Sequence, residues 1–415
     1  MHNVSSRPAH PAGNPIARSS RHVRVAIFTN TYHPTVNGVA NCVDAYRMGL
    51  EARGHEVYVF APCPNDYDAS QDRHHVLRFP AMPLIGDWDY DIALPYSKPV
   101  MEALHDLKFD VVHTQHPVWV GVWGMWYARW AGLPLVTTVH TEYRLYAGLV
   151  PLPAPLVEWF LETRVSAYCN KCHLVTTPTQ TTRERLRREG VTAPIEILHN
   201  PIDLRALPAP DPAPVRERHG IPSQAFLMGF IGRLAPEKDL PKVLSAAAQV
   251  LKEHPDARFL MGGTGPEHKP LVALAQRLGV ADRVIFTGLI PHDQVTHYQA
   301  ALDVFMTASM SETQPLSYTE AMAVGTPVVA LRAPGAVDMI QHEHNGLLVE
   351  PEAGAEGLAA GARRLAQDSA LRARLSEQAE SWVRRYDLPT VLDRLLELYE
   401  LTLARHAAHL QEGQD

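Results

Sequence analysis

Two glutamates eight positions apart, Glu312 and Glu320, are the first residues whose type and spacing suggest chemistry. They lie in the stretch "SETQPLSYTEAMAVG", residues 311–325, with Pro315 between them. A carboxylate accepts hydrogen bonds from a pair of sugar hydroxyls, so one acid for each of two sugar rings makes chemical sense. The alternative for this pair alone is two solvated charges on a surface helix.

The flanking residues indicate how these carboxylates are positioned. The run "DVFMTAS", residues 303–309, predicts a strand. Pro315 predicts the start of a helix, because the first N–H groups of a helix have no partner within it and proline lacks an N–H. Glu312 then lies in the connecting loop, and Glu320 lies about one and a half turns into the helix. The two acids would therefore reach different parts of one ligand.

Short apolar runs alternate with longer helical patterns along the whole chain. The runs are residues 23–30, 55–62, 110–115, 133–140, 226–232, 258–263, 283–288, 303–309 and 326–331. This rhythm predicts βαβ units and an α/β fold with two doubly wound, Rossmann-like parallel sheets. The expected organisation is a flexible tail (1–20), a first domain (21–206), a proline-rich hinge (207–220), a second domain (221–385) and a C-terminal helix (386–415) that returns to the first domain.

Composition excludes several classes of function. The chain has 415 residues, 46% of them hydrophobic, and a net charge of −7. The first 205 residues hold 19 basic and 19 acidic residues, so the net charge lies in the second half, and no basic cluster indicates nucleic acid. No run is apolar enough to span a bilayer or to serve as a secretory signal, and the four cysteines are scattered. We therefore expect a cytoplasmic protein.

Chemically useful residues follow several of the predicted strands, where open α/β sheets bind their ligands. Gly38 follows the first strand and opens a helix, whose amino end favours an anion. Arg233 and Lys238 follow the first strand of the second half, and two such cations suit a diphosphate. Gly263 and Gly265 lie in "GGTGPE", a second glycine-rich turn that opens a helix.

Together these motifs resemble the family 4 retaining nucleotide-sugar glycosyltransferases, which have the two-domain GT-B fold. The resemblance spans about residues 22–400 and is carried by "NTYHPTVNGVA", "GRLAPEKDL", "GGTGPE", "TGLIPHDQVTHYQAALDVF" and the two spaced glutamates. "HTQ" at 113–115 and "VHTEYRLY" at 139–146 are most similar to bacterial glucosyltransferases that act on diacylglycerol at the membrane surface.

The resemblance implies a role for each site residue of the donor. Glu312 would contact the hydroxyls of the donor sugar near the reacting carbon, and Glu320 would bind the ribose hydroxyls. Arg233 and Lys238 would hold the diphosphate and neutralise the departing nucleotide. The backbone at Gly38 would also approach the phosphates.

The remaining implied contacts concern the glycine-rich turn, the base and the acceptor. Gly263 and Gly265 would belong to the donor site, and Leu289 and Ile290 would border the base. His140, and also His116, would line the sugar and acceptor side of the cleft as catalytic residues. For both histidines the alternative is that the ring only satisfies loop backbone.

Two departures from the family pattern leave the donor sugar open. Pro315 stands where the family more often has glycine. In "RAPGAVDMI", residues 332–340, Pro334 and Asp338 replace the usual second glycine and a glutamate.

The sequence thus predicts hexose transfer, with glucose from UDP-glucose moved to a lipid hydroxyl such as that of diacylglycerol. Contact with the cytoplasmic membrane surface would be weak and reversible. We expect no metal and no other cofactor, since the nearest Asp-x-Asp lookalike, "DWDYD" at 87–91, reads as a surface loop. The alternatives are GDP-mannose-dependent mannosyl transfer, a nicotinamide oxidoreductase, which lacks its G-x-G-x-x-G, and a non-catalytic sugar-nucleotide binder.

Tryptophan is concentrated in one predicted helix. Trp119, Trp123, Trp126 and Trp130 share one face, which predicts packing against a sheet, the alternative being a surface that contacts lipid. Burial is also expected for Leu156, Trp159 and Phe160 in residues 152–168, the alternative being partial exposure near the acceptor entrance.

Overall fold

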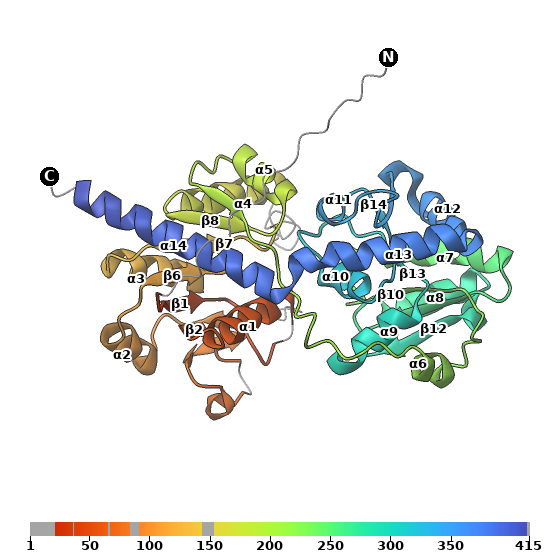
Figure 1. Ribbon diagram of the computed structural model, residues 1–415, viewed down its shortest axis with the longest axis horizontal. Coiled ribbons are helices and arrows are strands. Elements are labelled where there is room, and N and C mark those ends of the chain that lie inside the picture. The colour runs from red at the N-terminus through yellow and green to blue at the C-terminus, as the bar shows by residue number, and fades with distance from the viewer. Residues whose placement is uncertain (1–20, 36, 65–66, 84–90, 143–152, 413–415) are drawn as a thin grey trace, which may run out of the picture.

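The computed structural model describes residues 21–35, 37–64, 67–83, 91–142 and 153–412. Two parallel β-sheets form the centres of two domains that lie side by side along the long axis of the molecule (Figure 1). The prediction of two doubly wound, Rossmann-like sheets is confirmed, and each of the nine predicted strands is present.

The first sheet has seven parallel strands. In their order across the sheet they are β3 (Val76–Phe79), β2 (Glu56–Pro62), β1 (Arg24–Phe28), β6 (Val111–Thr114), β7 (Leu135–Thr138), β8 (Leu174–Thr177) and β9 (Ile195–Ile197). A two-stranded antiparallel sheet, β4 (Ala81–Pro83) with β5 (Asp91–Ala93), precedes α2. The helices of this domain are α1 (Gly38–Glu51), α2 (Lys98–Asp106), α3 (Val120–Trp130), α4 (Ala154–Cys169) and α5 (Gln180–Arg188).

Alternation along the central strand β1 creates a core on each side of this sheet. Val25 and Ile27 belong to a cluster with α1 and the C-terminal helix α14 (Leu388–Glu412). Ala26 and Phe28 belong to the opposite cluster, with α2, α3, α4 and α5. Because successive side chains of a strand point to opposite faces, one apolar strand serves both layers.

The second sheet has six parallel strands, in the order β12 (Val284–Gly288), β11 (Arg258–Gly262), β10 (Leu227–Ile231), β13 (Val304–Thr307), β14 (Val328–Leu331) and β15 (Gly346–Val349). Its helices are α6 (Ala213–Arg218), α7 (Leu240–Glu253), α8 (His268–Arg277), α9 (Val295–Ala301), α10 (Leu316–Ala323), α11 (Ala336–Met339), α12 (Gly354–Gln367) and α13 (Ser369–Val383). Short 3-10 turns occur in both domains. The first domain has η1 (Ala69–Gln71), and the chain after β10 has η3 (Pro236–Lys238), η4 (Ala281–Arg283), η5 (His292–Gln294), η6 (Pro351–Ala353) and η7 (Arg384–Tyr386).

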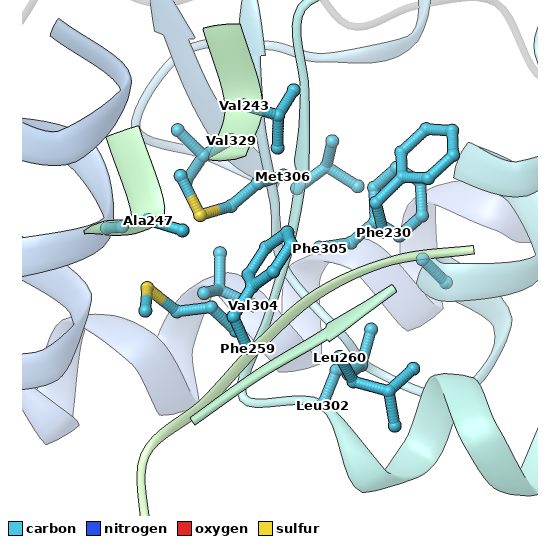
Figure 2. Packing of buried hydrophobic residues seen from close by; sticks show 14 of the residues in the cluster. Phe230, Val243, Ala247, Phe259, Leu260, Leu302, Val304, Phe305, Met306 and Val329 are labelled. Carbon is cyan, nitrogen blue, oxygen red and sulfur yellow. The ribbon is translucent and has the colours of Figure 1, made fainter. Parts of the chain in front are cut away.

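Aromatic residues fill the centre of the second domain. The rings of Phe230 on β10 and Phe305 on β13 lie 5.7 Å apart between centroids, among aliphatic side chains such as Val304 and Leu302 (Figure 2). This continuous core fixes β10 and β13 as neighbours. It therefore fixes the positions of the loops that follow these two strands.

The chain crosses between the domains twice. Within 207–220, the expected hinge, the short helix α6 places Val215 in the core of the second domain. The chain crosses back after α13, and α14 packs against α1 of the first domain (Figure 1). Where the two crossings meet, Ile202 forms a β-bridge with Asp387.

The prediction that the tryptophan face of α3 packs against the sheet is wrong for three of its four members. Trp119, Trp126 and Trp130 are exposed, and Trp123 alone packs into the core, edge to face with Phe79.

The reason is the small residues on the opposite face of α3. A Cβ added at Gly121 would lie 1.7 Å from the carbonyl oxygen of His116, and one at Gly124 would lie 2.8 Å from the ring of Phe28. The helix approaches the sheet through its glycines, so the large rings point outward. The expected burial of Leu156, Trp159 and Phe160 on α4 is also wrong, since all three are exposed.

Candidate active site

Loops from the carboxyl ends of both sheets meet between the domains. The hydroxyl of Thr313, in the loop after β13, donates to the backbone oxygen of His140, after β7, at 2.6 Å. Nearby, a Cβ added at Gly38, after β1, would lie 3.7 Å from the side chain of Leu316 on α10. The sheets thus present their ligand-binding edges to each other, as expected for open α/β sheets.

Glu312 is held by contacts within the second domain. Its carboxylate forms an ion pair with Lys238 and accepts a hydrogen bond from the Ser309 hydroxyl at 3.2 Å. Both side chains of the ion pair are about one-fifth exposed, at 18% for Glu312 and 22% for Lys238. The structure therefore joins the residue expected at the sugar to one expected at the diphosphate.

Arg233 lies outside this pair. Its guanidinium forms an ion pair with Glu237, one turn further along, and its side chain is 63% exposed. An exposed pair of this kind adds little stability, so the guanidinium remains available to an anion.

Gly263 and Gly265 shape the backbone beneath Arg233. Their φ angles are +123° and +153°, and added Cβ atoms would lie 1.9 Å from the oxygen of Gly232 and 2.3 Å from that of Leu234. Only glycine permits this approach, which places the loop after β11 directly against the loop after β10. Contact between these glycines and a donor stays a prediction.

Glu320 is the most unusual carboxylate of the site. It lies partly buried in α10, and among the residues described here it has no hydrogen-bond or ion-pair partner. Burial raises the pKa of Glu320 to about 7. A carboxylate kept in such a place without a donor is typical of a binding site, where a ligand supplies the missing hydrogen bonds.

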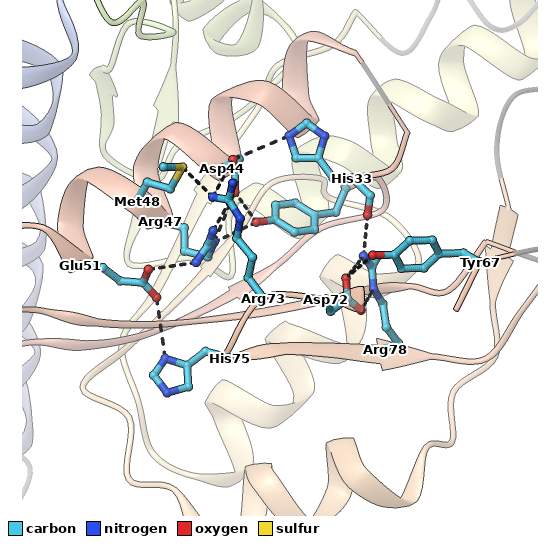
Figure 3. Close-up of polar contacts among 11 residues, drawn as sticks. His33, Asp44, Arg47, Met48, Glu51, Tyr67, Asp72, Arg73, His75 and Arg78 are labelled. Atoms are coloured by element: carbon cyan, nitrogen blue, oxygen red, sulfur yellow. Dashed lines mark hydrogen bonds and ion pairs between the residues drawn. The ribbon is translucent and has the colours of Figure 1, made fainter. Parts of the chain in front are cut away.

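The loop that leads to Gly38 is anchored from the first domain. Asn37 caps α1 by accepting from the backbone N–H of Ala40 at 2.9 Å, so the helix begins at Gly38. Arg78 donates to the backbone oxygen of His33 and forms a buried ion pair with Asp72 (Figure 3). This network fixes the backbone from which α1 starts.

Leu289 and Ile290 were expected to border the base of a nucleotide. Their side chains lie in different environments. Ile290 is buried, and its side chain lies 2.5 Å from a Cβ added at Gly262 on β11. Leu289 is 76% exposed. Only Leu289 therefore offers free apolar surface to a ligand.

Both predicted histidines are buried after strands of the first sheet. The Nδ1 of His140 lies 3.2 Å from Asn200 Oδ1, and its Nε2 lies 2.8 Å from Gln115 Oε1. Burial lowers the pKa of His140 to about 4, against a smaller opposing effect of the Asn200 contact. A neutral imidazole of this kind can form hydrogen bonds to a substrate without carrying a charge.

His116 is bound more closely to its own loop. Its Nδ1 accepts from the backbone N–H of Asn30 at 3.2 Å, and burial lowers its pKa to about 3. Satisfying loop backbone is thus one observed task of this ring.

Three residues that complete the site were not identified from the sequence: Thr313, Gln314 and Asn200. The Gln314 amide forms two hydrogen bonds with the backbone of Asn200. The position of Gln314 between Glu312 and Pro315 could have marked it as a candidate site residue. Its hydrogen-bond partner Asn200 lies more than a hundred residues away in the sequence, so the contact itself had no local signal. The segments 87–90 and 143–146, to which sequence expectations also apply, lie outside the described residues.

Comparisons with known proteins agree with this architecture. The family model "Glycosyltransferase Family 4" matches residues 36–206, and "Glycosyl transferases group 1" matches residues 213–382. The chain is 30% identical over 331 residues to alpha-monoglucosyldiacylglycerol synthase of Streptococcus pneumoniae, covering 79% of this chain and 75% of the relative. It is 27% identical over 357 residues to a GDP-mannose-dependent alpha-mannosyltransferase of Corynebacterium glutamicum, covering 84% of this chain and 82% of that one.

Among solved structures, the Anabaena protein HepE in complex with UDP-glucose matches with a TM-score of 0.74 and 22% identity, covering 91% of this chain and all of that one. Fold and sequence therefore define a glycosyltransferase. The chain belongs to the family 4 glycosyltransferases with the GT-B fold, and its resemblance to the bacterial diacylglycerol glucosyltransferases is confirmed.

Proposed function

We propose that the chain is a retaining, metal-independent glucosyltransferase that moves glucose from UDP-glucose to a lipid hydroxyl, such as that of diacylglycerol, at the cytoplasmic membrane surface. The observation that carries this proposal is the ion pair of Glu312 with Lys238, which shares a loop with Arg233, together with the unpartnered carboxylate of Glu320 in α10, the helix that follows Glu312. The similarity to alpha-monoglucosyldiacylglycerol synthase supports the choice of glucose and of a lipid.

Each residue then has a distinct task. Glu320 accepts from the ribose hydroxyls, and Glu312 accepts from the sugar hydroxyls near the reacting carbon. Lys238 and Arg233 neutralise the diphosphate as the sugar–phosphate bond breaks, which stabilises the transition state more than the ground state. Glucose in UDP-glucose is α-linked, so an α-glycoside like that in the relative's name requires retention of configuration.

Contact with a membrane is supported by the apolar surface of the first domain. Among the described residues, the exposed aromatic side chains all belong to this domain: Tyr96, Trp119, Trp126, Trp130, Trp159 and Phe160. Amphipathic rings of this kind suit the interface of a bilayer. None of the helices in the described part of the chain has the length and apolar character needed to cross a membrane.

A panel of donors tests the proposal. UDP-glucose should raise the melting temperature more than GDP-mannose or NAD⁺, and transfer to diacylglycerol in mixed vesicles should give an α-glucoside by NMR. Preferred binding and transfer of mannose would establish the alternative that the mannosyltransferase relative suggests. Binding of a sugar nucleotide without turnover on any acceptor would indicate a non-catalytic binder.

A further inference from the structure

The loop that carries Glu312 touches the first domain at the site. The Gln314 side chain accepts from the backbone N–H of Asn200 at 2.9 Å and donates to its backbone oxygen at 3.0 Å. One residue earlier, Thr313 donates to the backbone oxygen of His140. Two successive residues after the acid thus bind two different loops of the first domain.

The contact at Gln314 continues to the predicted histidine. Gln314 and Asn200 are both buried, and the Asn200 side chain lies 3.2 Å from Nδ1 of His140. A side-chain amide that pairs with both backbone polar groups of one residue has a more defined orientation than a side chain held by a single hydrogen bond. Asn200 therefore links the side chain of Gln314 to the ring of His140.

The opposite side of the loop is closed by the second domain. Gly335 has a φ of +76°, and a Cβ added there would lie 2.6 Å from the backbone oxygen of Glu312 and 2.9 Å from that of Thr313. The loop is confined between this glycine and the first domain. Its position depends on both domains at once.

We propose that Gln314 is a positioning residue, which ties the Glu312 loop to Asn200 so that Glu312 and His140 take their working positions only when the two domains are closed. The inference rests on the proposed function for its assignment of Glu312 and His140 to the reaction. A role in holding the domains together is a weaker account, because other contacts already do so. Asp338 accepts from the backbone N–H of Thr181 at 3.2 Å, and α14 packs on α1.

The test replaces Gln314 with methionine, which has similar length and no amide. Loss of two hydrogen bonds should lower kcat by roughly thirty-fold, with the KM for UDP-glucose and the affinity for UDP changed less than about two-fold. Hydrogen exchange of the Asn200 amide, followed by mass spectrometry, should become faster. Gln314→Glu is the second variant. It keeps the acceptor for the Asn200 amide N–H and loses the donor to the Asn200 oxygen, so kcat should fall while exchange of the Asn200 amide stays closer to that of the wild type.

Gln299→Met is the matched control. Its buried amide donates to the backbone oxygen of Ser317 within the second domain, at 3.5 Å. The control should keep the wild-type kcat and the wild-type exchange at Asn200, even if its melting temperature falls.

Wild-type kcat in both Gln314 variants would overturn the proposal, as would equal losses of kcat and UDP affinity, because a collapsed site would then explain them. Fast exchange of the Asn200 amide hydrogen in the wild-type protein would show that Gln314 does not hold Asn200. If the wild-type protein transferred no sugar from any donor, the proposed function would fail. The exchange measurement would still decide whether Gln314 ties the domains.

Discussion

Replacing Glu320 with glutamine should stabilise the unliganded protein while weakening its binding of nucleotide. Burial raises the pKa of Glu320 from 4.5 to about 7. Each pKa unit corresponds to about 1.4 kcal/mol, so keeping this carboxylate ionised at pH 8 costs about 3 kcal/mol. Glutamine has no charge to desolvate, and Glu320→Gln should raise the free energy of unfolding in urea by up to about 3 kcal/mol.

The pH dependence follows from the direction of the shift. Because the folded-state pKa is raised, the contribution of Glu320 to stability is full below about pH 4.5 and is lost as the pH rises through 7. The advantage of the variant over the wild type should shrink from about 3 kcal/mol at pH 8 to about 1 kcal/mol at pH 5.5. All other titrating groups are common to both proteins and cancel in this difference.

Nucleotide binding gives the second half of this prediction. Hydrogen bonds to a charged group contribute about 1.5–3 kcal/mol each, so Glu320→Gln should weaken UDP binding by at least about ten-fold. Glu312→Gln is the control: Glu312 is paired with Lys238, so replacing it removes an ion pair and should bring no gain in stability. A stability difference for Glu320→Gln that stays constant from pH 5.5 to 8 would refute the reasoning.

Further predictions concern catalysis, metal, acid stability and lipid. Glu312→Gln should abolish transfer with UDP affinity nearly unchanged, and full steady-state activity in this variant would contradict its role. Chelators should leave transfer unaffected, whereas activity lost with EDTA and restored by Mn²⁺ would contradict metal independence. Burial lowers the pKa of His113 to about 3, so His113 takes up a proton at higher pH in the unfolded state than in the folded state. As the pH falls from 7.5 to 5, this difference should lower the free energy of unfolding by about 2 kcal/mol. His113→Asn should therefore flatten the pH dependence of urea unfolding, and an unchanged slope would count against this. Trp159→Ala with Phe160→Ala should reduce vesicle binding with little change in melting temperature, since these side chains are 62% and 48% exposed; a large fall in melting temperature would show that they are core.

The fold could be predicted because its signals are local. Each strand of a sheet that is covered on both faces is a short apolar run, so the sequence marks it without knowledge of its neighbours. The residues predicted to bind the donor also have local signals. Arg233, Lys238 and Glu312 follow strands of one domain after a few residues, and Glu320 lies in α10, the helix that comes next. Their approximate positions required only the rule that ligands bind at the carboxyl ends of strands.

Features that depend on distant partners could not be predicted. Gln314 is ordinary in type, and only contact with Asn200, from the other domain, gives it a task. The prediction that the tryptophans of α3 are buried was wrong for a related reason. Their helix has two candidate inner faces, one aromatic and one with Gly121 and Gly124, and the distance between helix and sheet decides between them. A single sequence does not contain that distance.

Charge pairing among the residues of the candidate site bears on how a donor would bind there. Arg233 and Lys238 both have carboxylate partners, Glu237 and Glu312, so neither cation is left without a counter-charge. The Arg233 pair is exposed and weak, and a diphosphate can displace Glu237 at little cost. Lys238 is more buried, but its ammonium has three donors and can hold Glu312 while it also reaches a phosphate oxygen. Under the proposed function, the group that neutralises the leaving nucleotide would then also orient the carboxylate that binds the sugar. Removing Lys238 would therefore disturb both ends of the bond that breaks.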